Sequence, residues 1–552
     1  RYFNNQELES TLKSWVETYP GTCALSTIGE SFEKRPIWLL TLTNHQTGAD
    51  IEKPAIWLDG NIHATEIAGT TTVLFIAYNL LTRYGEDRQI TRLLDTCTFY
   101  LVPRINPDGA DLAMSANPRY IRSGVRSYPF TEKDEGLHPQ DIDGDGRILQ
   151  MRIPDPAGDW KISSLDSRLM EKRGPNEQDG AFYRVLPEGL VEDYDGYLIK
   201  MARPVEGLDF NRNFPFEWRP EVEQSGAGPY PTSEQEIKGV ADFIACHGNI
   251  NTAITYHTFA GVILRPYSTR ADDHMEVDDL RTYKKIGDLG TKLTGYRCVS
   301  TFHEFKYAPN EVTTGAFDDW MYDHHGAYTF TIELWDLPTK AGIKDRKLIE
   351  WYQDHPHEQD VQILKWADEH IGDGSYVNWY AYDHPQLGEI ELGGWNSIYT
   401  WRNPPPAFMG EEAARNLPYV LALGDMLPHL SIYSLEAAPL GGDDYRINLV
   451  VENTGFFPTF TSAQGKKRQS IRPVRVELEL PAAVTLVNGK KRVELGHLEG
   501  RSNKLDVTII WGGSPTDNRA RAEWVLHGPA GSEITFHIRS ERAGSLHRTI
   551  KL

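Results

Sequence analysis

The chain has 552 residues, of which 40% are apolar, 11% aromatic and 24% charged, a composition that favours two or three folded domains over a disordered chain. Its 57 basic and 78 acidic residues give a net charge of −21, so neither nucleic acid nor an anionic membrane surface is an expected partner. No apolar run approaches the length of a membrane span.

The first part of the chain predicts alternating helices and strands. Residues 7–18 have an amphipathic helical pattern, and two short runs rich in isoleucine, leucine and tryptophan, 34–44 and 53–61, are typical of strands. Apolar residues recur at helical spacing over 65–84, and 97–109 predicts another buried strand that ends in a turn. This order of strand, helix and strand favours a mixed or parallel sheet covered by helices.

A histidine and a glutamate follow the second strand, in the segment LDGNIHATEIAG. His63 and Glu66 are three residues apart, so on a helical turn both side chains share one face and can reach one ion. Zinc accepts imidazole nitrogen and carboxylate oxygen, and a catalytic site takes three protein ligands and leaves one position for water. Taken alone, this short pattern favours a polar pair that caps the following helix over a metal site.

Residues 130–205 interrupt the α/β pattern. The segment is dense in glycine, proline and aspartate, which predicts a long inserted excursion that its aromatic residues order in part. Three aspartates at alternate positions and a glycine have the spacing that begins a calcium loop: Asp141, Asp143, Asp145 and Gly146. Position 12 of that loop is Arg152 instead of glutamate, which excludes a standard EF-hand. A calcium-stabilised insertion and a plain Asx-rich turn both remain open.

The α/β pattern resumes after the insertion. The expected elements are a helix over 233–247, a strand over 252–258, a helix over about 277–294, a strand over 327–336 and a last helix over 411–427. His257, at the end of the first of these strands, is the candidate third metal ligand. The alternative is an ordinary hydrogen-bonded histidine at a strand end.

After about residue 430 the pattern changes to short alternating runs separated by turn residues, with no run of helical length. The predicted strands are 445–455, 472–481, 504–513, 520–528 and 533–542. Such runs are typical of a β-sandwich. The chain therefore predicts an α/β domain over 1–428, which includes the insertion, and a β-sandwich domain over 429–552.

Five short motifs, in this order, resemble those of the zinc metallocarboxypeptidases of the pancreatic carboxypeptidase A/B type: HATE (63–66), NPDG (106–109), NRN (211–213), YH (256–257) and TIEL (331–334). The resemblance covers about residues 5–340, apart from the insertion. It implies a carboxypeptidase-like α/β fold with a mixed, mostly parallel sheet covered by helices. It also implies that His63, Glu66 and His257 hold one zinc ion. Glu333 matches the catalytic glutamate, which takes a proton from the zinc-bound water and hands it to the leaving amine.

The same resemblance assigns the cationic residues of the site. Arg122 falls where the family places the arginine that stabilises the oxyanion, and Arg126 is the other candidate. Asn211 and Arg212 match the clamp for the terminal carboxylate of a peptide, because a guanidinium offers two parallel donors to a carboxylate.

The residue that lines the side-chain pocket falls at Asp318, or at Phe317 or Asp319 if the alignment gap shifts. An acid there would favour a C-terminal lysine or arginine by charge pairing, and the alternative is an aspartate that only starts a helix. Many members also carry a closing tyrosine about nine residues before the tryptophan of the DW pair. Counting back from Trp320 leads to Glu311, while Tyr307 lies nearby, so the residue that closes the site stays open.

The resemblance implies a zinc-dependent carboxypeptidase that acts on the C-termini of peptides or proteins. One alternative is an amidase of the same fold acting on cell-wall or other modified peptides, which the missing tyrosine favours and Arg212 disfavours. Another is a non-catalytic peptide-binding protein on this scaffold. The sequence leaves the oligomeric state and the role of the sandwich open.

The four cysteines, Cys23, Cys97, Cys246 and Cys298, stand far apart and form no CxxC pair. Cys97 and Cys246 lie near apolar runs, which favours buried thiols, although one or two disulfides remain open. The sequence starts at Arg1 without a signal-like segment. The mature start of an exported protein and a trimmed chain would both look like this. A secreted or periplasmic location is favoured over a cytoplasmic one.

Overall fold

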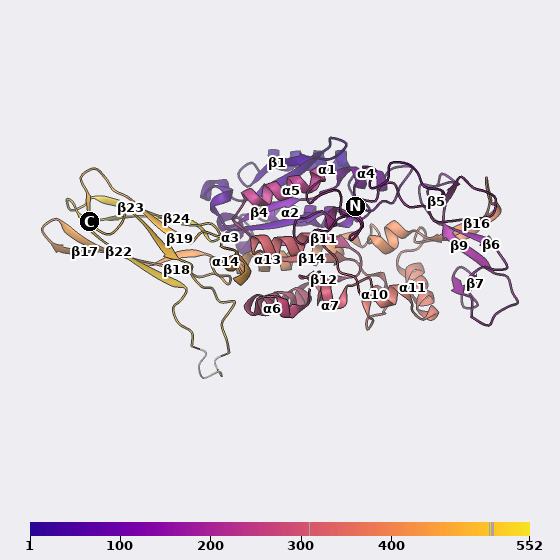
Figure 1. Ribbon diagram of the computed structural model, residues 1–552. Helices are drawn as coiled ribbons and strands as arrows, with labels where there is room; N and C mark the ends of the chain where they lie inside the picture. Colours follow the sequence, from indigo (N-terminus) through magenta and orange to yellow (C-terminus); the bar gives the residue numbers. More distant parts are fainter. Residues whose placement is uncertain (309, 507, 509–512) are drawn as a thin grey trace.

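A central α/β unit carries a smaller β-rich lobe at one end and a pair of β-sheets at the other, which makes the molecule elongated (Figure 1). The structure, a computed structural model, describes residues 1–552 except 309, 507 and 509–512. Half of the predicted strand over 504–513 therefore lies outside the described residues.

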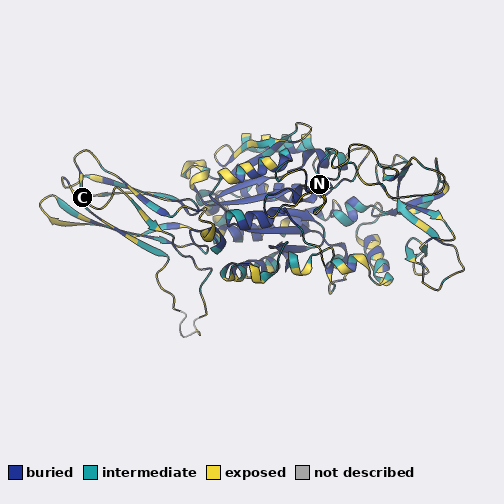
Figure 2. Ribbon diagram, in the orientation of Figure 1, coloured by how far each residue is buried: buried dark blue, intermediate teal, exposed yellow. Residues whose placement is uncertain are grey.

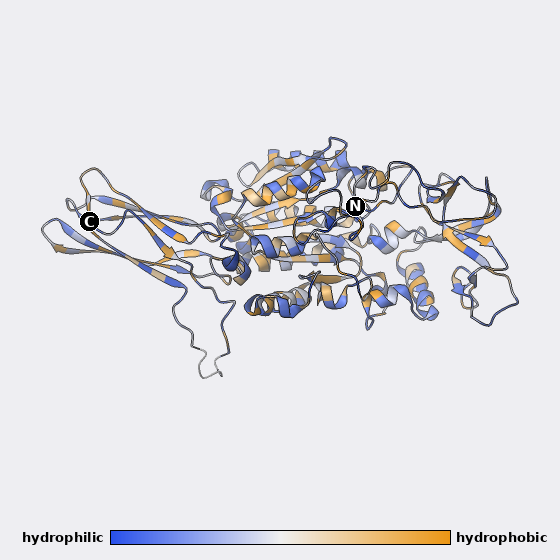
Figure 3. Ribbon diagram, viewed as in Figure 1, coloured by the Kyte–Doolittle hydropathy of each residue, from blue (hydrophilic) through white to orange (hydrophobic). Residues whose placement is uncertain are grey.

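The central sheet has eight strands in the order β1-β2-β4-β3-β11-β14-β12-β13. Its four middle strands run parallel, and all of their residues are buried: β4 (Thr98–Val102), β3 (Ala55–Gly60), β11 (Ile250–Thr258) and β14 (Tyr328–Leu334). Strands covered on both faces need near-continuous apolar runs, which is the pattern that made them visible in the sequence. Figure 3 shows the apolar residues gathered on these strands, and Figure 2 shows that the same strands are the most buried part of the molecule.

The outer strands of this sheet are mostly antiparallel to their inner neighbours. On one side, β1 pairs with β2 and β2 with β4, both antiparallel; on the other, β12 runs antiparallel to β14 and parallel to β13. Their bounds are β1 (Cys23–Glu30), β2 (Pro36–Leu42), β12 (Val262–Arg265) and β13 (Arg297–Ser300). The sheet is thus mixed with a parallel centre, which confirms the predicted fold class.

Helices lie on both sides of the sheet (Figure 1). The larger ones include α1 (Asn5–Thr18), α2 (Ala68–Thr82), α3 (Arg88–Thr96), α5 (Gln235–Cys246), α6 (Val277–Thr294), α8 (Phe317–His325) and α11 (His357–His370), and the shorter ones include α4 (Pro107–Ala113), α7 (Thr301–Glu304), α9 (Leu337–Lys340) and α10 (Leu348–Gln353). The single helix predicted over 411–427 is wrong, because the structure has two, α12 (Met409–Ala414) and α13 (Leu417–Met426). Pro418 stands in the first turn of α13, where a proline is tolerated because the amide at that position needs no partner within the helix. In the middle of one continuous helix the same proline would remove a hydrogen bond, so the chain forms two helices.

The insertion forms a lobe together with a later hairpin that the sequence pattern did not predict. A six-stranded sheet in the order β15-β16-β6-β9-β7-β8 combines β6 (Gln150–Pro154), β7 (Trp160–Ile162), β8 (Met170–Lys172) and β9 (Tyr183–Pro187) with β15 (Tyr376–His384) and β16 (Gly388–Trp395). A smaller sheet pairs β5 (Gly136–Pro139) with β10 (Gly189–Glu192). Leu137 and Met151 pack against Ile390 and Leu392 in one small core, so neither segment could bury its apolar residues alone. We call residues 130–205 and 376–395 the inserted lobe.

The C-terminal region consists of two four-stranded, all-antiparallel sheets, β17-β18-β22-β20 and β21-β19-β23-β24. The strands are β17 (Leu430–Gly441), β18 (Asp444–Asn453), β19 (Val474–Glu479), β20 (Thr485–Asn488), β21 (Arg492–Gly496), β22 (Arg519–His527), β23 (Glu533–Ser540) and β24 (Gly544–Lys551). Their inward residues share one apolar core that includes Val476, Trp524 and Phe536. The region also contains one short helix, α14 (Ala463–Arg468), whose six residues are too few to show a helical period in the sequence.

The four cysteines are free thiols. The prediction of a buried thiol is confirmed for Cys97 and wrong for Cys246, which is exposed because it ends α5 on the solvent side of the helix. Within the described parts of the chain, no helix combines the length and the apolar character needed to cross a membrane.

Candidate active site

The carboxyl ends of β3, β11 and β14 meet at one edge of the sheet, because the three strands are adjacent and parallel. His257 lies directly opposite Glu333 in the pairing of β11 with β14, and Tyr256 lies opposite Gly60 in the pairing of β11 with β3. The chain that leaves β3 after Gly60 therefore arrives beside His257. Open α/β sheets bind ligands at this edge.

A tight turn between β3 and α2 carries His63 and Glu66. A β-carbon at Gly60 would lie 2.6 Å from the backbone of Gly69, so only glycine allows the two ends of this turn to approach so closely. The amide of Glu66 donates to the carbonyl of His63 over 3.2 Å. Both side chains thus lie on the turn that precedes α2, and not inside a helix as their spacing suggested.

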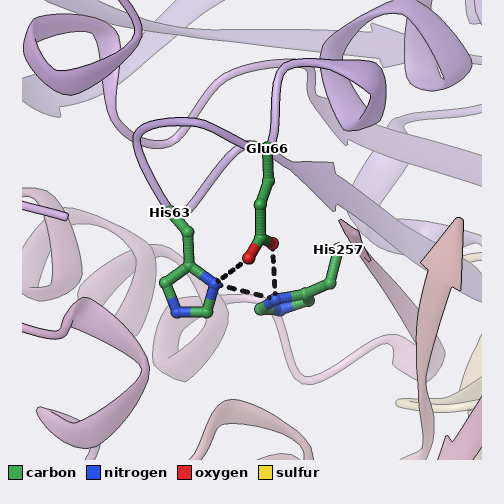
Figure 4. Close-up of side chains that lie close together, drawn as sticks. All are labelled: His63, Glu66 and His257. Carbon is green, nitrogen blue, oxygen red and sulfur yellow. Dashed lines mark hydrogen bonds and ion pairs between the residues drawn. The ribbon is translucent and has the colours of Figure 1, made fainter. Parts of the chain in front are cut away.

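His63, Glu66 and His257 direct their donor atoms at one another (Figure 4). The Nδ1 atom of His63 is 3.0 Å from Glu66 Oε1 and 3.1 Å from the Nδ1 atom of His257, which is itself 3.1 Å from Glu66 Oε2. The three residues are buried, each about 2% exposed. Two ligand atoms of a tetrahedral site with bonds of about 2.1 Å are about 3.4 Å apart. The donor set and its separations therefore fit a zinc ion after an outward shift of a few tenths of an ångström.

Asp209 fixes the orientation of His63. Its Oδ1 atom lies 3.1 Å from His63 Nε2, which holds the proton of the ring on that nitrogen and leaves Nδ1 free as a ligand. Burial alone would raise the pKa of Asp209, but the charges of Arg122 and Arg212 hold it well below its usual range. The sequence pattern did not predict Asp209 as a site residue, although it stands two positions before the candidate clamp residue Asn211 and between two buried apolar side chains.

The structure distinguishes the two candidate arginines. Arg122 donates from Nε to Asp209 over 2.8 Å and from Nη1 to Glu66 over 3.3 Å, so its guanidinium borders the histidine–glutamate cluster. Arg126 instead forms a two-pronged ion pair with Glu234, through bonds of 3.2 and 2.6 Å. Of the two, Arg122 is the one beside the cluster.

Asn211 and Arg212 lie in the short 3-10 turn η3 (Phe210–Arg212). The Asn211 carboxamide oxygen accepts the amide of Phe317 over 2.8 Å, which ties this turn to the start of α8. Arg212 is 8% exposed and donates from Nη1 to the carbonyl of Asn211 over 2.7 Å, while its Nη2 is 3.9 Å from Asp209. Its guanidinium thus keeps donors available on the side that faces the cleft.

A single cleft collects these residues from distant parts of the chain. Its lining includes His63, His257, Arg122, Asn211, Arg212, Asp318, Glu333 and Tyr307. Asp318 is the one of the three pocket candidates that lines it; Phe317 packs edge-to-face against Phe214, and Asp319 accepts the amide of Ser268. Asp318 accepts the hydroxyl of Thr331 over 3.3 Å and is 4% exposed.

Glu333 is the last acid of the cleft, one residue before the end of β14. Burial raises its pKa well above the usual range, and repulsion by Glu66 raises it further. Its Oε2 atom is buried without a hydrogen-bond partner among the described residues, as is Nε2 of His257. Buried polar atoms of this kind normally have partners, so the cleft is built to receive polar groups.

Tyr307 and Glu311 lie on the loop before α8. Tyr307 lines the cleft, whereas Glu311 lines an adjoining pocket that also includes Arg212 and Tyr307. Counting nine residues back from Trp320 therefore leads to a residue outside the lining of the cleft, whereas Tyr307, further back on the same loop, belongs to that lining.

The aspartates of the inserted lobe form a compact turn. Asp141 accepts the amides of Gly144 and Gly146 over 2.7 and 2.8 Å. Asp143 and Asp145 each accept the amide two residues further on, over 3.0 and 2.8 Å. These bonds are those of an Asx-rich turn, and although ligand atoms of the three acids lie within 4.8 Å of one another, no further observation supports calcium.

Comparison with known proteins relates most of the chain to zinc carboxypeptidases. A family model described as zinc carboxypeptidase matches residues 8–352, and one described as a domain of unknown function matches residues 429–551. Carboxypeptidase A2 of Mus musculus is 26% identical over 385 residues, 64% of this chain and 71% of that protein. Carboxypeptidase B2 of Homo sapiens is 27% identical over 365 residues, 63% of this chain and 66% of that protein.

Among solved structures, thrombin activatable fibrinolysis inhibitor superimposes with a TM-score of 0.43 at 20% identity, covering 77% of this chain and 74% of that one. Carboxypeptidase A from Helicoverpa armigera gives a TM-score of 0.41 at 17% identity, covering 67% of this chain and 73% of that one.

Proposed function

The chain belongs to the zinc carboxypeptidase family, and from that premise we propose that it hydrolyses the C-terminal peptide bond of peptides or proteins. The observation that carries the proposal is the shared cleft, in which a metal-ligand cluster, a glutamate and an arginine clamp face one another. An exopeptidase needs all three: activation of water, movement of a proton and recognition of a chain end.

His63, Glu66 and His257 would hold the zinc ion through their Nδ1 and carboxylate atoms. When bound there, zinc supplies a Lewis acid that polarises the scissile carbonyl and lowers the pKa of a water molecule. Asp209 keeps His63 in the tautomer that this ligand set requires.

Glu333 acts as general base and then as general acid. The raised pKa of Glu333, which burial causes, favours a carboxyl group that holds a proton between the two steps. It takes the proton of the attacking water and gives it to the nitrogen of the departing residue, so the carboxyl group ends the cycle as it began. Arg122 presents donors to the oxygen that becomes negative when the carbonyl is attacked.

Asn211 and Arg212 bind the terminal carboxylate of the substrate. The free donors of Arg212 support this role, since a guanidinium matches a carboxylate with two parallel bonds. The clamp fixes which bond reaches Glu333, so a chain with an amide terminus should be a poor substrate. Tyr307 is the residue that closes over the bound terminus, a role supported by its place in the lining of the cleft.

Asp318 selects a C-terminal lysine or arginine. Its carboxyl group lines the cleft with Arg212, where it would meet the side chain of the departing residue. Lysine and norleucine have side chains of similar size that differ in charge, so they isolate the contribution of Asp318. We expect Asp318→Asn to lower the kcat/KM ratio for lysine over norleucine at least about tenfold, and an unchanged ratio would contradict the assignment.

The proposed function is tested by incubating the zinc-loaded protein with a mixed peptide pool, with and without a chelator, and identifying the released residues. Single C-terminal residues should be released, and the chelator should stop their release. Glu333→Gln has nearly the same shape and should lower kcat by about 10²- to 10⁴-fold while zinc content is unchanged.

A matched pair of peptides, one with a free C-terminal carboxylate and one with an amide, tests the terminal clamp. Equal cleavage of the two would favour an amidase over a carboxypeptidase. Peptide binding without hydrolysis at any zinc content would favour a non-catalytic binding protein.

We also propose that residues 1–428, with the inserted lobe, form the catalytic domain and that residues 429–552 form a separate accessory domain. The sandwich has an apolar core distinct from that of the central sheet, which supports the division.

A further inference from the structure

Residues 396–404, which lie between β16 and α12 and include the short helical turn η5 (Ser397–Arg402), are anchored on both sides of the cleft. On one side, the Trp335 indole donates to the carbonyl of Thr400 over 2.7 Å, and Trp335 stands two residues after Glu333. On the other, the side chain of Asn403 donates to the carbonyl of Thr65 over 2.7 Å and accepts the amide of Ala68 over 2.9 Å. Thr65 and Ala68 flank the ligand Glu66. The segment therefore bridges the strand that carries the base and the turn that carries two metal ligands.

This segment lies outside the part of the chain that the family model matches, which ends at residue 352. It follows directly from the hairpin β15–β16 of the inserted lobe. The inserted lobe is thus connected to the active site through residues 396–404, a short hydrogen-bonded segment that we call the strap.

Arg402 lies between the two anchors. Its guanidinium carbon is 5.9 Å from the centre of the ring of Phe259, two residues past the ligand His257. Burial lowers the pKa of Arg402, and the negative charges of Glu66 and Glu333 oppose that shift, so the guanidinium is within electrostatic reach of both carboxylates. Yet no hydrogen bond or ion pair joins it to any of the described residues. A half-buried cation without a partner is unfavourable unless a ligand supplies one.

The position of Arg402 indicates which part of a substrate it meets. The departing residue occupies the cleft lined by Asn211, Arg212 and Asp318, and Arg402 is not part of that lining. Arg402 instead lies on the strap between Thr400, which Trp335 holds, and Asn403, which binds the turn that carries Glu66. The peptide that extends away from the reacting carbonyl, on its acyl side, is the part of the substrate that reaches it.

We propose that Arg402 is a specificity-determining residue, which binds a carboxylate on the acyl side of the substrate and so favours peptides with an acidic residue just before the scissile bond. The inference rests on the proposed function, whose substrate it defines further. A guanidinium is suited to this role because its planar donors match a carboxylate in two parallel bonds, whereas a carbonyl oxygen uses only one of them.

Steady-state kinetics on paired peptides test the proposal. The two peptides carry the same C-terminal residue and differ only by glutamate or glutamine in the penultimate position. We expect the wild-type protein to prefer the glutamate peptide about tenfold or more in kcat/KM, mainly through KM, and Arg402→Ala to abolish that preference. Arg402→Lys should retain part of it, and Arg402→Glu should invert it towards a penultimate lysine.

Arg521→Ala is the matched control, because Arg521 lies on β22 of the sandwich and pairs there with Asn448 and Glu523. It should leave both rates unchanged. An equal loss on the two peptides in Arg402→Ala, or an unchanged ratio, would overturn the proposal, since the first outcome indicates a contact to the peptide backbone and the second indicates no contact.

A binding measurement separates failure of this inference from failure of the proposed function. Calorimetric titration of both peptides into zinc-loaded Glu333→Gln, with and without Arg402→Ala, needs no turnover. Absence of hydrolysis by the wild type refutes the proposed carboxypeptidase activity. Equal affinities for the glutamate and glutamine peptides in Glu333→Gln refute the role of Arg402 whether or not the wild type is active.

Discussion

Asp59 is an acid enclosed in the central sheet, four residues before the proposed metal ligand His63. Its two carboxyl oxygens accept the indole of Trp57 and the hydroxyl of Thr255, each over 2.6 Å, and its side chain is fully buried. Burial raises the pKa of Asp59 to about 7, against an ordinary value of 3.8. The folded protein therefore holds a proton that the unfolded chain releases between about pH 4 and pH 7.

The sign of the resulting pH dependence follows from that difference. The contribution of Asp59 is fully present below about pH 4 and is lost as the pH rises through 7, by up to about 4 kcal/mol at about 1.4 kcal/mol per pKa unit. Asp59→Asn keeps a neutral side chain at every pH. We expect the free energy of unfolding of the variant, relative to wild type, to rise between pH 4 and pH 8 in urea titrations. Parallel curves for the two proteins would show that Asp59 does not change its charge in this range.

Asp209 links the metal-ligand cluster to the arginines, since it contacts His63 on one side and Arg122 on the other. Asp209→Asn keeps the size of the side chain but removes the charge that orients the imidazole. We expect the zinc dissociation constant, measured by competition with a coloured chelator, to rise about 10- to 100-fold.

Asp111→Asn is the control for this experiment, because Asp111 is a half-exposed acid that pairs with Arg35 away from the cleft. It should bind zinc as the wild type does. An unchanged zinc affinity in folded Asp209→Asn would mean that His63 is held by its surroundings without the carboxylate.

At the scale of elements, the turn between β3 and α2 depends on close contact of two glycines. The added methyl group of Gly60→Ala would lie 2.6 to 3.0 Å from backbone atoms of Gly69, and backbone cannot move aside as a side-chain end can. We expect a loss of about 1–3 kcal/mol in stability and a weaker zinc site, because the turn that carries His63 and Glu66 must shift.

Gly410→Ala gives the comparison for this prediction. Gly410 lies in α12 with nothing within 4 Å of an added β-carbon, so that variant should match or exceed the wild type in melting temperature and zinc content. Full zinc affinity in Gly60→Ala would mean that the turn tolerates a wider approach.

The parts of the site that the sequence could predict are those that follow visible strands. The runs before His63, His257 and Glu333 are continuously apolar because both faces of their strands are covered, so the strand ends, and the polar residues at them, are recognisable. Parallel order then brings these ends to one edge. The motif order added the arginine clamp to this set.

Asp209, Arg402 and Asn403 could not be predicted in the same way. Asp209 and Asn403 contact the site across 146 to 338 residues of the chain, and Arg402 reaches it only through its charge. All three stand in or beside the short turns η3 and η5, which are too brief to show a period in the sequence. The hairpin β15–β16 was missed for a related reason. Few of its residues are buried, because β16 pairs with β6 of the distant insertion, and apolar and polar residues therefore alternate only weakly along the hairpin.

At the scale of the whole molecule, the sandwich and the cleft lie at opposite edges of the central sheet. Asn251, near the start of β11, donates to the carbonyl of Arg542 over 2.9 Å and so joins the sheet to the C-terminal region. His257 lies six residues further along the same strand, about 20 Å away at the rise of an extended chain. The sandwich therefore leaves the mouth of the cleft free, while the inserted lobe lies at the other end of the molecule (Figure 1).

Asp279 of α6 joins the central α/β unit to the C-terminal region. Its carboxylate accepts the hydroxyls of Tyr322 and Tyr328, both over 2.9 Å, and the amides of Ala463 and Gln464 at the start of α14, over 2.7 and 2.9 Å. The acid is fully buried, so its removal leaves four donors without an acceptor and out of contact with water. One side chain thus holds both the tyrosine pair of the catalytic unit and the helix of the C-terminal region.

We expect Asp279→Ala to separate the two units during unfolding. Each unsatisfied buried donor costs about 1–3 kcal/mol, enough to weaken the interface before either core fails. Differential scanning calorimetry should then resolve two transitions where the wild type has one, with the zinc-dependent transition belonging to the catalytic unit. Asp278→Ala, on the same helical turn but half exposed and paired only with Arg281, should keep the wild-type profile. A single transition shifted to lower temperature in Asp279→Ala would mean that the two units unfold as one body whatever joins them.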